Sequence, residues 1–186
     1  MSSDLNPHVE DIIHDQDKRP PMRGPLTAFN GTVARYGMYL SVVGLFAIVA
    51  IVFYQVFGRY VLNSSPTWTE NLALVLVLYV TLIGAAVGVR DAGHIGMESL
   101  LVLVPDKMRN RIELVIHVLV MLFGAGMIYN GLVLGQSVLS YKIPNLGLPE
   151  TIRYAPLVIS GVLIISFSIE HVMALLQDKE VVPSWH

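Results

Sequence analysis

Residues 71–89 read NLALVLVLYVTLIGAAVGV, nineteen consecutive positions without Asp, Glu, Lys or Arg. A helix of this length rises ~28 Å, close to the ~30 Å hydrocarbon core of a bilayer. Three further stretches lack charged residues in the same way, at 36–58, 114–141 and 154–169. Four such stretches in a chain of 186 residues predict an all-α integral membrane protein, a bundle of four transmembrane helices.

The overall composition favours the same class of protein. Hydrophobic residues make up 54% of the chain and charged residues only 14%, against ~25% charged in an average soluble protein. The formal net charge of −2 gives no reason to expect a nucleic-acid partner. The chain has no cysteine, which excludes disulfides, thiol catalysis and thiolate metal sites.

The charge pattern also predicts the domain organisation. We expect a polar N-terminal tail over 1–35, a membrane domain over 36–176 and a polar C-terminal tail over 177–186. The N-terminal tail carries several charged residues and is not expected to be a signal peptide, because it lacks the apolar segment of one. The third span, at ~42 Å, must tilt or project from the membrane. The four spans are predicted at 36–57, 71–89, 114–141 and 154–176.

The basic residues predict how the chain is oriented. Four spans place both tails and the 90–113 connection on one side of the membrane. That side holds nine basic residues: Lys18, Arg19, Arg23, Arg35, Arg90, Lys107, Arg109, Arg111 and Lys179. The other side holds three: Arg59, Lys142 and Arg153. By the positive-inside rule, both termini are expected in the cytoplasm.

The connection between the second and third spans has a helical pattern of its own. Met97, Leu100, Leu101 and Val104 are spaced i, i+3, i+4, i+7, as on one face of a helix. An apolar-faced helix beside a basic cluster is typical of a segment lying in the membrane interface. We therefore predict a short interfacial amphipathic helix at 95–104, with an ordinary helical linker as the alternative.

The connection between the first and second spans ends in Thr67-Trp68-Thr69-Glu70. This order fits a capping box, in which Thr67 caps the second helix and Glu70 reaches back to the cap. Trp68 stands where an interfacial aromatic residue is expected. Arg59 and Arg90 each follow the end of a helix, where a cation suits the helix dipole.

Two spans contain a G-x-x-x-G motif, at Gly84 with Gly88 and at Gly131 with Gly135. Small residues at this spacing allow helix backbones to approach closely. The motif is compatible with packing inside this chain's own bundle and with contact to a helix of a partner.

The middle of each span lacks acids and bases, and an ion-coupled carrier would need such groups or broken helices. His94, His117 and His171 are expected near one depth, so a haem-binding or quinone-linked membrane anchor of an electron-transfer complex is an alternative. Their spacing matches no ligand motif, so we expect no metal or cofactor. The spans contain no Ser/His or paired-Asp arrangement, so we expect no enzymatic activity.

Residues 54–98 read YQVFGRYVLNSSPTWTENLALVLVLYVTLIGAAVGVRDAGHIGME. This stretch resembles the small permease subunit, DctQ-like, of the tripartite ATP-independent periplasmic (TRAP) transporters. The resemblance is carried by Arg59-Tyr60, by Trp68 and Glu70, by Gly84-Ala85-Ala86, and by Arg90 with His94. Two departures are Asn71, where the family's W-x-E-E pattern has a second acid, and Tyr79, where a tryptophan is frequent.

The resemblance implies a subunit of a secondary transporter of the bacterial inner membrane. A periplasmic substrate-binding protein would deliver a small organic solute, such as a carboxylate, to a large many-helix permease driven by an ion gradient. The small subunit would scaffold that permease within the membrane lipid. From the resemblance and the glycine motifs together, the candidate partner contacts are Arg59, Tyr60, Trp68, Glu70, Gly84, Gly88, Arg90, His94, Gly131 and Gly135.

Overall fold

A computed structural model gives the fold of the chain. It describes residues 20–22, 24–64, 66–91, 106–177, 179 and 181, apart from the side chains at 106, 107 and 109. Four helices in this part of the chain are long and apolar enough to cross a membrane, which confirms the predicted four-helix membrane fold. The elements are α2 (Pro25–Tyr60), α3 (Thr67–Asp91), α5 (Asp106–Ser137), the 3-10 helix η1 (Glu150–Arg153) and α6 (Ala155–Leu176).

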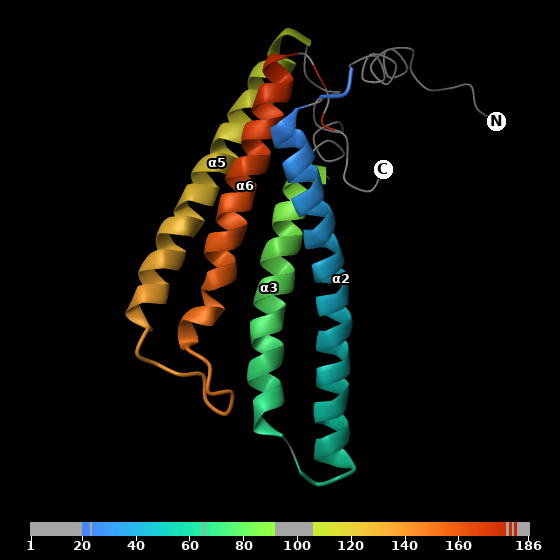
Figure 1. Ribbon diagram of the computed structural model, residues 1–186, viewed down its shortest axis with the longest axis vertical. Helices are drawn as coiled ribbons and strands as arrows, with labels where there is room; N and C mark the ends of the chain where they lie inside the picture. The colour runs from blue at the N-terminus through green and yellow to red at the C-terminus, as the bar shows by residue number, and fades with distance from the viewer. Residues whose placement is uncertain are drawn as a thin grey trace, which may run out of the picture.

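The helices form two antiparallel pairs, α2 with α3 and α5 with α6 (Figure 1). Helices α3 and α6 pack together and join the pairs, so the spatial order is α2, α3, α6, α5. Helices α2 and α5 are therefore the outer helices of the arrangement. We call the end where α2 begins and α3 finishes the Arg90 end, and the opposite end the Arg59 end.

Glycine and serine bring α2 close to α3. A methyl group on Gly37 would lie 2.9 Å from Val87 Cγ2, and one on Gly44 would overlap Val80. Ser41 Oγ lies 3.5 Å from the Val80 carbonyl oxygen, at the long limit of a hydrogen bond. The contact thus pairs valine side chains on α3 with small residues on α2, as is usual for helices that associate in lipid.

Glycine also sets the contact between α5 and α6. A methyl group on Gly161 would lie 2.8 Å from the Gly124 carbonyl oxygen, and one on Gly124 would lie 3.0 Å from the Gly161 carbonyl oxygen. The two backbones therefore cross with no room for a side chain between them. Overpacking such a contact generally costs about 1–3 kcal/mol.

Several helix boundaries differ from those expected, among them the start of α5 at Asp106, eight residues before the predicted third span. Helix α2 begins at Pro25, eleven residues before the predicted span, with Gly24 as N-cap and proline in its first turn. Helix α5 ends at Ser137, and residues 138–149 form a folded loop in which Ile143 is 1% exposed. Hydropathy reports the apolar length of a segment and does not report where its helical hydrogen bonding stops. The interfacial helix predicted at 95–104 lies outside the described residues.

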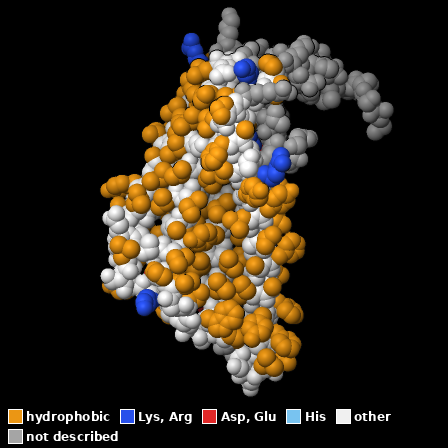
Figure 2. Space-filling view, in the orientation of Figure 1, with side chains coloured by type: hydrophobic (Ala, Val, Ile, Leu, Met, Phe, Trp, Pro, Cys, Tyr) orange, Lys and Arg blue, Asp and Glu red, His pale blue; other side chains and the backbone are white. Residues whose placement is uncertain are grey.

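The outer surface of the helices is apolar. Figure 2 shows hydrophobic side chains along the length of one face, with Lys and Arg mainly toward its upper end and further basic atoms at the lower left edge. This distribution matches a hydrocarbon belt bounded by two polar interfaces.

Candidate functional site

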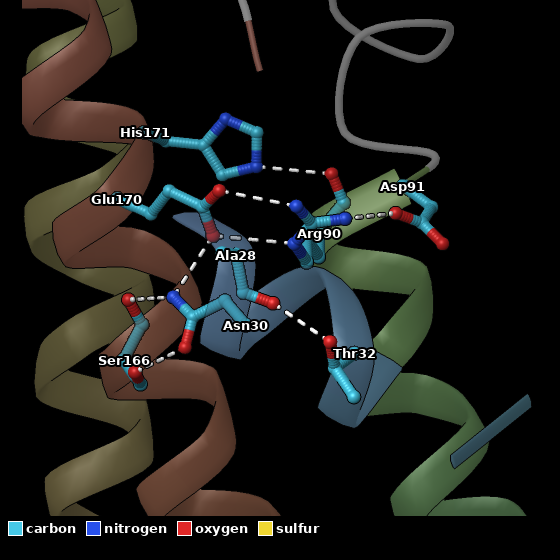
Figure 3. A network of polar contacts seen from close by, with 8 residues as sticks. All are labelled: Ala28, Asn30, Thr32, Arg90, Asp91, Ser166, Glu170 and His171. Carbon is cyan, nitrogen blue, oxygen red and sulfur yellow. Dashed lines mark hydrogen bonds and ion pairs between the residues drawn. The ribbon is translucent and has the colours of Figure 1, made fainter. Parts of the chain in front are cut away.

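A network of buried polar side chains occupies the Arg90 end, between α2, α3 and α6 (Figure 3). We call it the polar network. None of its charged or amide side chains is more than 4% exposed. Its members are Asn30 from α2, Arg90 and Asp91 from α3, and Ser166, Glu170 and His171 from α6.

The ion pair between Arg90 and Glu170 is at the centre of the polar network. Arg90 Nε donates to Glu170 Oε2 at 3.2 Å, and Arg90 Nη2 donates to Glu170 Oε1 at 3.1 Å. Arg90 Nη1 donates to Asp91 Oδ1 at 3.0 Å. A guanidinium that holds a carboxylate through two parallel bonds is among the stronger and more directional polar contacts in proteins. The contact fixes the end of α3 against α6.

Asn30 adds the third helix to this arrangement. Its Nδ2 donates to Glu170 Oε2 at 2.8 Å and to the Ser166 carbonyl oxygen at 3.2 Å. The Ser166 hydroxyl donates to Asn30 Oδ1 at 2.8 Å. The side-chain amide of Asn30 thus bonds to one turn of α6 through both its nitrogen and its oxygen. Because Asn30 lies near the start of α2, that end of α2 is tied to α6.

His171 makes the next contact of the polar network. Its Nε2 lies 3.0 Å from the Arg90 carbonyl oxygen. A carbonyl oxygen only accepts, so this nitrogen carries the hydrogen. The ring of His171 stacks on that of His117 from α5, with centroids 4.9 Å apart and planes 6° apart. Through this stack, α5 also contacts the residues that surround the ion pair.

The polar network lies near the boundary of the membrane and not at its centre. Arg35 and Arg59 on α2 are 24 residues apart, which corresponds to ~36 Å of helix and so roughly spans the ~30 Å hydrocarbon core. Asn30 lies five residues beyond Arg35, about one and a half turns further out.

A small apolar cluster packs beyond the polar network, where segments from both ends of the chain meet. Met22 and Val181 are 7% and 1% exposed and contact Ala174 of α6. Ala174 follows Glu170 by one helical turn, so this cluster helps separate the ion pair from water. Arg90 and Glu170 are consequently held in a setting where their attraction is weakly screened.

Sequence reasoning identified Arg90 but did not identify Asn30, Asp91 or Glu170 as its neighbours. Glu170 lies inside the predicted fourth span, 154–176, but no partner was predicted for it. The available signal was the position of Glu170 itself, since an acid well inside an apolar helix is expected to pair with a base. Arg90, at the end of another span, was such a base.

The residues predicted at the Arg59 end lie on the surface. Tyr60 is 80% exposed and Trp68 is 43% exposed, and Arg59 and Glu70 are exposed as well. The Trp68 ring packs near Tyr54 at a centroid distance of 6.4 Å. These side chains are therefore accessible from the aqueous side and the interface of this end.

The predicted capping box is not found among the described hydrogen bonds. Helix α3 already begins at Thr67, so Thr67 is not the residue before the helix. The hydroxyl that bonds at this end belongs to Thr69, which donates to the Pro66 carbonyl oxygen at 2.6 Å. Glu70 is left exposed in the first turn, where a carboxylate still suits the helix dipole.

The two departures from the family pattern both contact the segment that leads into α6. Asn71 donates from Nδ2 to the Pro144 carbonyl oxygen at 3.0 Å and accepts from Arg153 Nη2 at 2.8 Å. The Tyr79 hydroxyl donates to the Ile152 carbonyl oxygen at 3.1 Å. Asn71 and Tyr79 thus connect α3 to the loop and to η1 at the Arg59 end.

The predicted glycine motifs have different surroundings. Gly84 faces Ser41 of α2, whereas Gly88 has open space beside it. A methyl group on Gly131 would lie 2.7 Å from Val158 Cγ2, and one on Gly135 would lie 3.4 Å from Thr151 Cγ2. Gly131 and Gly135 therefore pack within the chain, and Gly88 is the member of these motifs with free space.

The histidine geometry does not favour the haem alternative. His117 and His171 lie face to face, so their ring nitrogens do not converge on a common point. His171 Nε2 is also engaged by the Arg90 carbonyl oxygen. His94, the third histidine considered, lies outside the described residues.

Residues 48–178 match the family described as tripartite ATP-independent periplasmic transporters, DctQ component. The chain belongs to this family. The match begins in the middle of α2 and includes Arg90 and Glu170, whereas Asn30 lies outside it.

Two relatives illustrate the range of this family. The sialic acid TRAP transporter small permease protein SiaQ of Vibrio cholerae is 24% identical over 131 residues, which cover 70% of this chain and 76% of that one. The sialic acid TRAP transporter permease protein SiaT of Haemophilus influenzae is 35% identical over 81 residues, 41% of this chain and 13% of that one. The chain is thus a multi-pass TRAP small permease subunit, a component of a transporter.

Proposed function

We propose that this subunit scaffolds a large many-helix permease in the bacterial inner membrane and does not itself provide the path for substrate or ions. The observation that carries the proposal is the placement of charge. Each span is free of acids and bases in its middle, and the buried charges of the described chain pair with one another at the Arg90 end. Four continuous helices of this kind offer rigid support but no midplane ion site.

The relatives support a partner of this kind and a carboxylate substrate. The permease protein SiaT contains a segment similar to this chain, which supports a permease as the partner. Both relatives are named for sialic acid, which is a carboxylic acid. We infer that a periplasmic binding protein delivers a small organic acid to the permease that this chain supports.

The distribution of basic residues supports one orientation of this subunit in the membrane. With nine basic residues on its side, the Arg90 end would face the cytoplasm, together with both termini. Arg59, Tyr60, Trp68 and Glu70 would then face the periplasm, where a binding protein could dock. Because the chain has no native cysteine, Ser64→Cys and Gln177→Cys can be labelled singly. An impermeant maleimide added to whole cells should label the first and spare the second; the opposite pattern contradicts this orientation.

Transport itself tests the scaffold proposal. Liposomes that contain this chain alone should show no gradient-driven uptake of an organic acid. Uptake should require the cognate permease in the membrane and the binding protein outside. Accumulation of substrate by liposomes with this chain alone would identify it as a free-standing carrier and contradict the proposal.

A further inference from the structure

Helix α2 has an aromatic side chain at every seventh position along its outer face. These are Tyr39, Phe46, Phe53 and Tyr60, which are 58%, 72%, 71% and 80% exposed. We call them the aromatic seam. A valine follows each of the first three aromatics by three residues, at Val42, Val49 and Val56, and these are 48%, 60% and 49% exposed.

The spacing of the aromatic seam is that of a helix-helix contact. An ideal helix drifts by ~20° per seven residues, so a strict repeat of seven stays aligned only with a neighbouring helix around which it supercoils. Alternating steps of three and four residues are the positions that insert between the side chains of such a neighbour. Lipid tails impose no such period on the residues that they contact.

Among the four described spans, α2 is the one with the least burial inside the bundle. None of its most apolar eighteen residues is buried, compared with 44% for α6. The opposite side of α2, with Gly37, Ser41 and Gly44, is already occupied by α3. The aromatic seam is therefore a second, separate contact face of the same helix.

The chain's own packing shows which partner fits this face. Its α2–α3 contact places branched side chains of one helix against small residues of the other. A symmetric contact between two copies of α2 would instead bring rings against rings. We propose that the aromatic seam docks a transmembrane helix of the large permease that presents small residues at heptad spacing. This inference rests on the proposed scaffold function and names the surface that performs it.

Photo-crosslinking in the assembled transporter tests the inference. Phe46 and Phe53 are replaced one at a time by p-benzoylphenylalanine, and Phe123 of α5, which is 66% exposed, serves as the matched control. Irradiated membranes that contain the permease should give a crosslink between the two chains from Phe46 and Phe53, and only lipid adducts from Phe123. The double variant Phe46→Ala with Phe53→Ala should lower permease recovery with the tagged chain by roughly tenfold.

Each other outcome has a definite meaning. Crosslinks from Phe46 and Phe53 to a second copy of this chain, or to lipid alone, would overturn the inference. So would a permease crosslink from Phe123 in their place, which would keep the scaffold function and assign it to α5. If the permease does not copurify with the unsubstituted chain, both the scaffold function and the inference are wrong. Far-UV circular dichroism of the double variant checks that the helical content of the chain is retained.

Discussion

The two ends of the membrane domain hold their charged side chains in opposite ways. At the Arg90 end, Arg90 and Glu170 are 80 positions apart in sequence, and their side chains are 1% and 0% exposed. At the Arg59 end, Glu150 and Arg153 are three positions apart, and their side chains are 25% and 24% exposed. One end thus joins separate helices through buried charge, while the other keeps its charges near water.

This difference in burial indicates that the charges at the Arg90 end stabilise the fold, whereas those at the Arg59 end contribute little to it. A buried ion pair attracts strongly because little water screens it, and losing one partner leaves an uncompensated charge. An exposed pair contributes little, because solvent replaces the lost contact. The Arg90 end therefore fixes how α2, α3 and α6 meet, and the Arg59 end leaves Arg59, Trp68 and Glu70 exposed on the surface of the chain.

The largest effect should come from breaking the buried pair. Glu170→Ala removes the carboxylate that pairs with the Arg90 guanidinium and that accepts a hydrogen bond from Asn30. We expect the free energy of unfolding to fall by about 3–5 kcal/mol. Unfolding of the purified chain by SDS in mixed micelles, followed by far-UV circular dichroism, measures the change.

The matched control removes the acid of the exposed pair. Glu150→Ala takes away the Arg153 partner at the Arg59 end and should lower stability by less than about 1 kcal/mol. Equal losses from Glu170→Ala and Glu150→Ala would show that the two ends do not differ as the burial of their side chains indicates.

A smaller effect is expected from the polar link at the Arg59 end. Asn71→Ala removes the bond to the Pro144 carbonyl oxygen and the bond from Arg153, and the site is only partly buried. We expect a loss of about 1–2 kcal/mol in the same unfolding measurement, since water can replace part of both contacts. Gln136→Ala, at an exposed position of α5, is the control and should change stability by less than about 0.5 kcal/mol. A loss from Asn71→Ala as large as that from Glu170→Ala would contradict the ranking.

The sequence was sufficient for the membrane fold because hydrophobicity and charge are local properties. Residues 71–89 lie inside α3, and the predicted fourth span coincides with α6 to within one residue. The start of α2 at Pro25 was not expected, because Asn30 and Arg35 interrupt the apolar pattern before Tyr36, yet residues 25–35 continue the helix. Residues 138–141 are largely apolar but belong to a loop, because packing by Ile143 turns the chain back.

The polar network was harder to predict because its contacts are non-local. Asn30 and Glu170 are 140 positions apart, and no spacing rule connects them. Arg90 was predicted as a partner contact at the end of a span, although it is 2% exposed in the described chain. Trp68 and Glu70 were predicted at the start of the second span and lie there at exposed positions, because this placement follows from the end of one helix and the start of the next.

The smallest expected effect is the dependence of the ion-pair coupling energies on salt. It distinguishes the two ends because salt screens charges near water more than buried charges. A double-mutant cycle with Glu150→Ala and Arg153→Ala should give a coupling energy of about 0.2–1 kcal/mol at low salt. At 1 M salt the Debye length falls to ~3 Å, so this coupling should approach zero. The corresponding cycle with Glu170→Ala and Arg90→Ala should keep most of its coupling at 1 M salt, because ions do not enter between side chains that are 1% and 0% exposed. A coupling at the Arg90 end that falls with salt as steeply as that of the exposed pair would mean that water reaches Arg90 and Glu170.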